Sequence, residues 1–84
     1  MKVHFYGSVQ KYGGGESVEV GQVETIGLLI EELGYKIGAD FKEYLLGENC
    51  FFLVNGRAIL GTGGLNTKVS LGDKIEILPV VEAG

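Results

Sequence analysis

Two stretches near the start of the chain alternate between apolar and polar positions. In residues 3–6, Val3 and Phe5 are the apolar members, and residues 17–20 repeat the same period of two. This period is typical of β-strands that have one buried face. Three consecutive glycines at 13–15 lie between the two stretches. The pattern therefore predicts a β-hairpin with a glycine-rich connection.

A helical pattern follows the predicted hairpin. Between residues 26 and 33, four apolar side chains recur at the spacing i, i+3, i+4, i+7, which is typical of an amphipathic helix. Thr25 is a favourable N-cap, and Gly34 is expected to end the helix. The apolar spacing of residues 37–46 is weaker, and we interpret this segment as a short helix or an irregular turn.

Three further strands are predicted in the second half of the chain. The apolar run 50–54 is long enough only for a strand. Asn55-Gly56 is a strong hairpin signal, and it leads into a return strand at 57–60. The last strand alternates over 74–78 and stops at Pro79.

The element order β-β-α-β-β-β predicts an α+β fold, in which a mixed sheet of about five strands packs one main helix on one face. A chain of 84 residues is long enough for one domain and too short for two. We therefore expect a single domain over residues 1–79 and an extended, flexible C-terminal tail over residues 80–84. Ile75 and Ile77 are expected to face the helix, which places Leu78 on the opposite face of the sheet.

The charge and the composition exclude several classes of function. Seven basic and eleven acidic residues give a net charge of −4, with no basic run that could bind a nucleic-acid backbone. The acidic balance suits a partner with a basic or apolar docking surface. No segment approaches the length of a membrane helix, and the first residues lack the apolar core of a signal peptide. With one cysteine only, the chain fits a reducing cytoplasm, where we expect the protein to be located.

The usual catalytic and metal-binding residue sets are missing from the sequence. Cys50 opens an apolar strand and is expected to be a structural thiol, while His4 is expected to lie on the surface. Neither glycine-rich stretch, 13–15 or 61–64, carries the Lys and Ser/Thr of a phosphate-binding loop. Glu31 and Glu32 are expected to lie on the solvent-exposed face of the helix. We therefore expect no metal site and no self-contained active site.

The C-terminal tail is the exception. Five extended residues reach about 16–18 Å beyond the last strand. The tail ends in two of the smallest residues, which would let its backbone enter a narrow channel and present a terminal carboxylate. A frayed terminus without function is the alternative. The tail residues are Val80, Val81, Glu82, Ala83 and Gly84.

Four stretches, 2–6, 25–29, 52–57 and 72–81, carry a resemblance to a known family. The most specific is 72–81, which is similar to the family pattern Gly-Asp-x-(Ile/Val)-x-(Ile/Val)-x-Pro-(Pro/Val)-Val before a terminal diglycine. On the basis of these four stretches, almost the whole chain resembles the MoaD/ThiS sulfur carriers of the ubiquitin-like β-grasp superfamily. Among these it resembles most the small subunit of molybdopterin synthase.

The resemblance implies a carrier that is not catalytic alone and binds no cofactor itself. A ubiquitin-activating-type adenylyltransferase (MoeB-like) would use ATP to adenylate the carboxylate of Gly84, and sulfur transfer would then give a thiocarboxylate. In molybdopterin synthase the tail enters the large subunit (MoaE-like) and donates sulfur to the pterin precursor of the molybdenum or tungsten cofactor. Val81, Glu82 and Ala83 would then line the tail. Ala83 departs from the diglycine of the family and adds one methyl group, a change that typically costs about 1–3 kcal/mol in a tight channel.

The resemblance also implies docking through the exposed face of the sheet. Tyr6, Leu78 and Val80, with Ala58 or Ile59, are the candidate partner-binding residues. Two alternatives stay open: a protein modifier that forms isopeptide bonds through the same activated tail, and a non-covalent β-grasp interaction module whose tail is inert.

Overall fold

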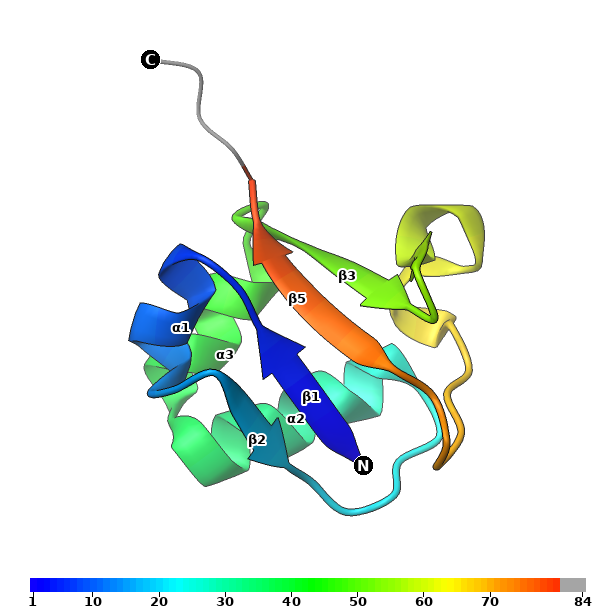
Figure 1. Cartoon of the computed structure of the whole chain (residues 1–84), viewed down its shortest axis with the longest axis horizontal. Helices are drawn as coiled ribbons and strands as arrows, with labels where there is room; N and C mark the ends of the chain where they lie inside the picture. The colour runs from blue at the N-terminus through cyan, green and yellow to red at the C-terminus, as the bar shows by residue number, and fades with distance from the viewer. Residues whose placement is uncertain (81–84) are drawn as a thin grey trace.

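A five-stranded mixed sheet forms one layer of the computed structural model, which describes residues 1–80 (Figure 1). The strands lie in the order β2-β1-β5-β3-β4. β1 and β5 pair in parallel, and the other neighbouring strands pair antiparallel. The strands are β1 (Lys2–Phe5), β2 (Ser17–Glu19), β3 (Cys50–Val54), β4 (Arg57–Ala58) and β5 (Ile75–Pro79).

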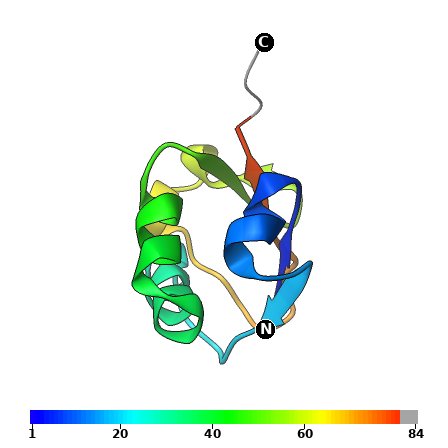
Figure 2. The same ribbon diagram turned by 90° about the vertical axis from the view of Figure 1, so that its left-hand side faces the viewer.

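Helices α2 and α3 pack on one face of this sheet, as Figure 2 shows from the side. The other face, which we call the outer face, carries the half-buried and exposed side chains of the strands. The helices are α1 (Ser8–Gly13), α2 (Ile26–Ile37) and α3 (Ala39–Leu46), with short 3₁₀ helices η1 (Ile59–Gly61) and η2 (Gly64–Asn66). The predicted α+β fold is thus confirmed, with three α-helices instead of one main helix. None of the helices within residues 1–80 is long and apolar enough to cross a membrane.

The core lies between α2 and the two central strands. Its fully buried side chains come from β1, α1, α2 and β5, and they are Val3, Phe5, Val9, Ile26, Leu29, Ile30, Leu33, Ile75 and Ile77. Ile75 and Ile77 are 0% exposed, which confirms that this side of β5 faces the helix. Because both neighbours of β5 are strands, the strand that leads to the C-terminus is held along both of its edges.

The start of α2 is as predicted, but its end is not. Thr25 caps the helix, with its Oγ1 accepting a hydrogen bond from the backbone N–H of Leu28 at 3.2 Å. The helix continues through Gly34 to Ile37, so the prediction that Gly34 ends it was wrong. A Cβ at residue 34 would lie 2.9 Å from the Cβ of Lys42. Gly34 therefore permits the close crossing of α2 and α3. The weaker pattern at 37–46 is a helix, α3.

Two predicted connections also differ from the structure. The pairing of β1 with β2 is confirmed, but six residues of the connection form helix α1, which buries Val9. The predicted return strand at 57–60 is shorter, because β4 ends at Ala58 and the chain continues as η1. In both places a short helix places one apolar side chain into the core.

The Gly13→Ala substitution is expected to destabilise the protein although alanine favours helices by about 1 kcal/mol. A Cβ at residue 13 would lie 2.6 Å from Cε2 of Phe5, whose ring is 1% exposed and cannot move away. Overpacking of this kind costs about 1–3 kcal/mol. Urea unfolding measures the change in the free energy of unfolding. Gly15→Ala is the matched control, since a Cβ there meets nothing within 4 Å. Equal stability of the two variants would contradict the expectation.

Candidate functional site

The end of β5, from which the C-terminal residues continue, is fixed by two neighbouring loops. The backbone N–H of Val80 donates a hydrogen bond to the carbonyl oxygen of Asn49 at 3.0 Å. On the other side Pro79 packs against Gly7, where a Cβ would lie 2.9 Å from the proline Cγ. Gly7 also has a φ of 56°, which favours glycine. We call Pro79 and Val80 the tail root.

The outer face next to the tail root is largely apolar. Phe51 of β3 lies opposite Leu78 of β5, and Leu53 lies opposite Glu76 in the same register. Phe51 is 46% exposed, while Leu53 and Leu78 are half-buried. This surface continues across β5 toward Tyr6, which follows β1 and is 38% exposed.

The structure places four of the five candidate partner-binding residues on this side. Tyr6, Ala58 and Val80 are exposed and Leu78 is half-buried. Ile59 is only 7% exposed and belongs to the core, so our expectation that it contributes exposed surface was wrong.

Beside the tail root, sequence reasoning missed the exposed apolar residues Phe51 and Leu60. Leu60, which follows the buried Ile59 in η1, is 84% exposed because successive side chains of a 3₁₀ helix, with three residues per turn, are rotated by about 120° about its axis. Phe51 lies within an apolar run, and only its register with β5 shows that it faces outward. Because residues 50–54 are all apolar, the sequence has no alternation of polar and apolar positions that could have identified this orientation.

Two cavities border the tail root, and Val80 lines both. One, of about 300 Å³, is mostly apolar and is lined by Phe51, Ala58 and Leu60. The other, of about 440 Å³, lies on the helical side, where Tyr12 and Tyr44 stack with ring centroids 4.4 Å apart. A partner that binds the tail could therefore contact the domain on both sides of the tail root.

The predicted tail residues lie outside the part of the chain that the structure describes. They are Val81, Glu82, Ala83 and Gly84.

The ThiS family model matches residues 3–84, which is nearly the whole sequence. The chain belongs to the ThiS family. It is a ubiquitin-like sulfur carrier of this family, and the match reaches Gly84 at the end of the tail. No curated protein is similar enough in sequence to count as a match.

Several solved structures share the fold of this ThiS-family chain. CysO of Mycobacterium tuberculosis, described as an antigen, has a TM-score of 0.82 at 26% identity over 95% of this chain and 98% of CysO. CysO of Amycolatopsis orientalis, solved in complex with BexX, has a TM-score of 0.80 at 25% identity over 99% and 98% of the two chains. A Pyrococcus furiosus protein assigned as subunit 1 of a molybdopterin converting factor has a TM-score of 0.66 at 21% identity over 95% of each chain. The last likeness shows the fold alone.

Cys50 of this ThiS-family chain lines the apolar cavity beside the tail root. Its thiol is half-buried, and burial raises its pKa to about 11. A thiol with this pKa is a poor nucleophile at neutral pH, because the thiolate is the reactive form. The geometry therefore favours the structural interpretation of Cys50. Residues 1–80 also contain no group of three or more His, Cys, Asp or Glu side chains that could hold a metal ion.

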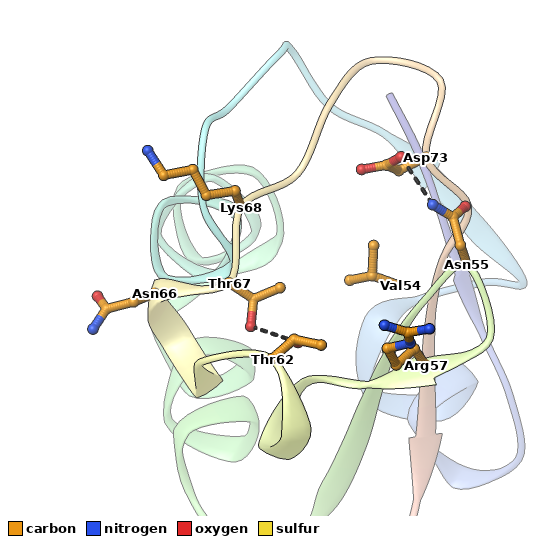
Figure 3. A pocket seen from close by; sticks show the side chains of 8 residues that line it. All are labelled: Val54, Asn55, Arg57, Thr62, Asn66, Thr67, Lys68 and Asp73. Atoms are coloured by element: carbon orange, nitrogen blue, oxygen red, sulfur yellow. Dashed lines mark hydrogen bonds between the residues drawn. The ribbon is translucent and has the colours of Figure 1, made fainter.

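A further cavity, of about 460 Å³, lies at the other end of the sheet, near the start of β5 (Figure 3). Most of its polar groups already have partners within the domain. Thr62 and Thr67 share a hydrogen bond of 3.1 Å between their hydroxyl oxygens. The side-chain amide of Asn55 donates to the Asp73 carboxylate at 2.9 Å, and its carbonyl oxygen accepts from the backbone N–H of Lys74 at 2.8 Å. Asn55 thus fixes the loop before β5, and we interpret this end of the molecule as structural.

Acidification is expected to weaken the contact between Asn55 and Asp73. The hydrogen bonds from Asn55 and from the backbone N–H of Ser70 hold the pKa of Asp73 below its usual value. Stability from this carboxylate is therefore present above the ordinary carboxyl pKa and is lost as the pH falls through the lowered value. Between pH 6 and pH 3 the free energy of unfolding should fall more for the wild type than for Asp73→Ala. Urea unfolding at the two pH values measures both changes, and equal losses would contradict the expectation.

Proposed function

We propose that this chain carries sulfur as a thiocarboxylate on Gly84 and delivers it as the small subunit of a molybdopterin synthase. The supporting observation is the position of the tail root, at the end of a central strand and beside an apolar surface. A partner that covers this surface receives the tail at the same time.

The proposed chemistry begins with activation of an unreactive group. A carboxylate is a poor acyl donor, so a MoeB-like adenylyltransferase joins the Gly84 carboxylate to the AMP part of ATP and releases pyrophosphate. A sulfur donor then displaces AMP, which leaves a thiocarboxylate with a nucleophilic sulfur. The chain supplies the acyl group and the docking surface, and the partner supplies the catalytic residues.

The assignment to molybdopterin synthase rests on the 72–81 motif, in which Pro79 and Val80 form the tail root. The Pyrococcus furiosus molybdopterin converting factor subunit shares the fold. The recipient would then be a MoaE-like large subunit, whose channel has to accept the methyl group of Ala83. CysO, which shares this fold, was solved in complex with BexX, and a BexX-type partner is the competing recipient.

Intact-mass spectrometry tests the activation step. The full chain is incubated with the adenylyltransferase of its source organism, ATP and a sulfur donor. Conversion is expected to add about 16 Da, the difference between sulfur and oxygen. The Ala83→Gly variant restores the diglycine and is the matched control. An unchanged wild-type mass under conditions that convert Ala83→Gly would contradict the proposal.

A second experiment identifies the recipient. The thiocarboxylated chain is mixed either with a MoaE-like large subunit and the pterin precursor or with a BexX-type partner. Return to the original mass in the first mixture alone supports the molybdopterin synthase assignment. Return in the second alone contradicts that assignment while leaving the carrier role intact. A ladder of conjugates on lysines of other proteins would instead indicate a protein modifier.

A further inference from the structure

A partly buried carboxylate borders the apolar surface beside the tail root. Glu76 is on β5, and its side chain is only 16% exposed. Its register partners on the outer face are Leu53 of β3 and His4 of β1. The next row toward the tail root consists of Phe51 opposite Leu78. A partner that docks on these apolar side chains therefore also covers Glu76.

The two oxygens of this carboxylate are used differently within the domain. Oε2 accepts a hydrogen bond of 2.8 Å from the hydroxyl group of Tyr6 and lies 3.7 Å from Nζ of Lys74. Oε1 makes no hydrogen bond or ion pair within residues 1–80. The bond from Tyr6 fixes the orientation of the carboxylate, so that one oxygen is held in place and the other can still accept a bond.

Covering this carboxylate has an energetic consequence. A charge that loses its water on binding is destabilised unless the partner provides an opposite charge or hydrogen-bond donors. Lys74 compensates only partly, since its side chain is 61% exposed and its ammonium contacts the oxygen that Tyr6 already occupies. The free Oε1 therefore needs a donor from outside the chain.

We propose that the adenylyltransferase that activates the tail presents a basic side chain, surrounded by apolar surface, that pairs with Glu76 when it docks on the outer face. This inference rests on the proposed function and adds the chemistry by which the partner is selected. An apolar surface alone is compatible with many proteins. A fixed, half-buried carboxylate disfavours binding of proteins that would leave it unpaired or bring an acidic group to it.

Binding of the full-length chain to the adenylyltransferase tests this proposal. Glu76→Gln removes the charge while its side-chain oxygen can still accept the bond from Tyr6. We expect its Kd, measured by calorimetry, to rise about tenfold or more. Glu32→Gln is the matched control: it makes the same change in net charge at an exposed position of α2. Its Kd should stay within about twofold of the wild-type value.

Three further variants separate the partner's cation from contacts within the chain. Tyr6→Phe removes only the hydroxyl group, and it should weaken binding less than Glu76→Gln. Lys74→Gln and His4→Gln remove the neighbouring basic groups of the chain itself, and they should leave most of the affinity. If either reproduces the loss seen for Glu76→Gln, the required cation comes from the chain and the proposal is overturned.

The outcomes distinguish this inference from the proposed function. If the wild type gains sulfur and Glu76→Gln binds as tightly as Glu32→Gln, no basic side chain of the partner pairs with Glu76. The proposed carrier function then stands without this inference. If the wild type is neither bound nor adenylated, the proposed function fails, and this inference fails with it. Thermal unfolding of each variant verifies that a loss of binding is not a loss of fold.

Discussion

Deletion of Gly84 is expected to abolish thiocarboxylate formation, with a loss of more than about 100-fold in rate. The deletion moves the carboxylate back along the tail by about 3.5 Å and places a methyl group on the activated residue. A displacement of only about 1 Å in a reacting group can cost 10²-fold. Intact-mass spectrometry after incubation with the adenylyltransferase, ATP and a sulfur donor follows the reaction.

Two comparisons make this expectation specific to Gly84. Ala83→Gly keeps the terminal glycine and should react at least as fast as the wild type. The free energy of unfolding should be the same for all three chains, because the core residues belong to the domain and not to the tail. Sulfur gain by the shortened chain at the wild-type rate would show that the terminal residue is not the determinant.

Truncation of two neighbouring aromatic residues is expected to reduce stability to very different extents. Phe5 is 1% exposed, and its ring meets that of Phe41 edge-on at 5.4 Å between centroids. Phe5→Ala should lower the free energy of unfolding by about 3–5 kcal/mol. Tyr6 lies on the outer face and loses mainly its hydrogen bond to Glu76, so Tyr6→Ala should cost about 0.5–1.5 kcal/mol.

Urea unfolding and partner binding together verify this pair of expectations. A domain of this size has a total stability near the lower end of 5–15 kcal/mol, so Phe5→Ala should be partly unfolded in buffer. Tyr6→Ala should remain folded and lose affinity for the adenylyltransferase. A similar loss of stability in both variants would mean that the two faces of β1 are not as different as the burial of Phe5 and Tyr6 indicates.

The sequence was sufficient to identify the five strands and α2, although not all of their ends, because most of them carry a periodicity that reflects burial on one face. It was not sufficient for α1, since a helix of six residues with one buried side chain, Val9, has no period to recognise. Gly34 misled us for a different reason. A glycine that ends a helix and a glycine that lets another helix approach look the same until the packing partner, here Lys42, is known.

The candidate site was predictable in part. The outward direction of Leu78 followed from the alternation along the last strand, whereas the positions of Leu60 and Glu76 depended on tertiary geometry, and the tail stays a prediction. No local pattern predicts that Ile59 points inward and Leu60 outward, because both belong to the 3₁₀ helix η1, whose orientation is set by its packing on β3. The placement of Glu76 between Leu53 and His4 depends on the pairing of β5 with both neighbours.

The protonated state of the Cys50 thiol determines which sulfur atom would be labelled in a chain that carries a thiocarboxylate. With a pKa of about 11, only about one thiol in ten thousand is ionised at pH 7. A thiocarboxylate sulfur is anionic at this pH. A mild alkylating reagent should therefore attach to the C-terminus and leave the side chain untouched. In the proposed reaction, the same difference would keep the thiol of Cys50 from attacking the acyl-adenylate of Gly84.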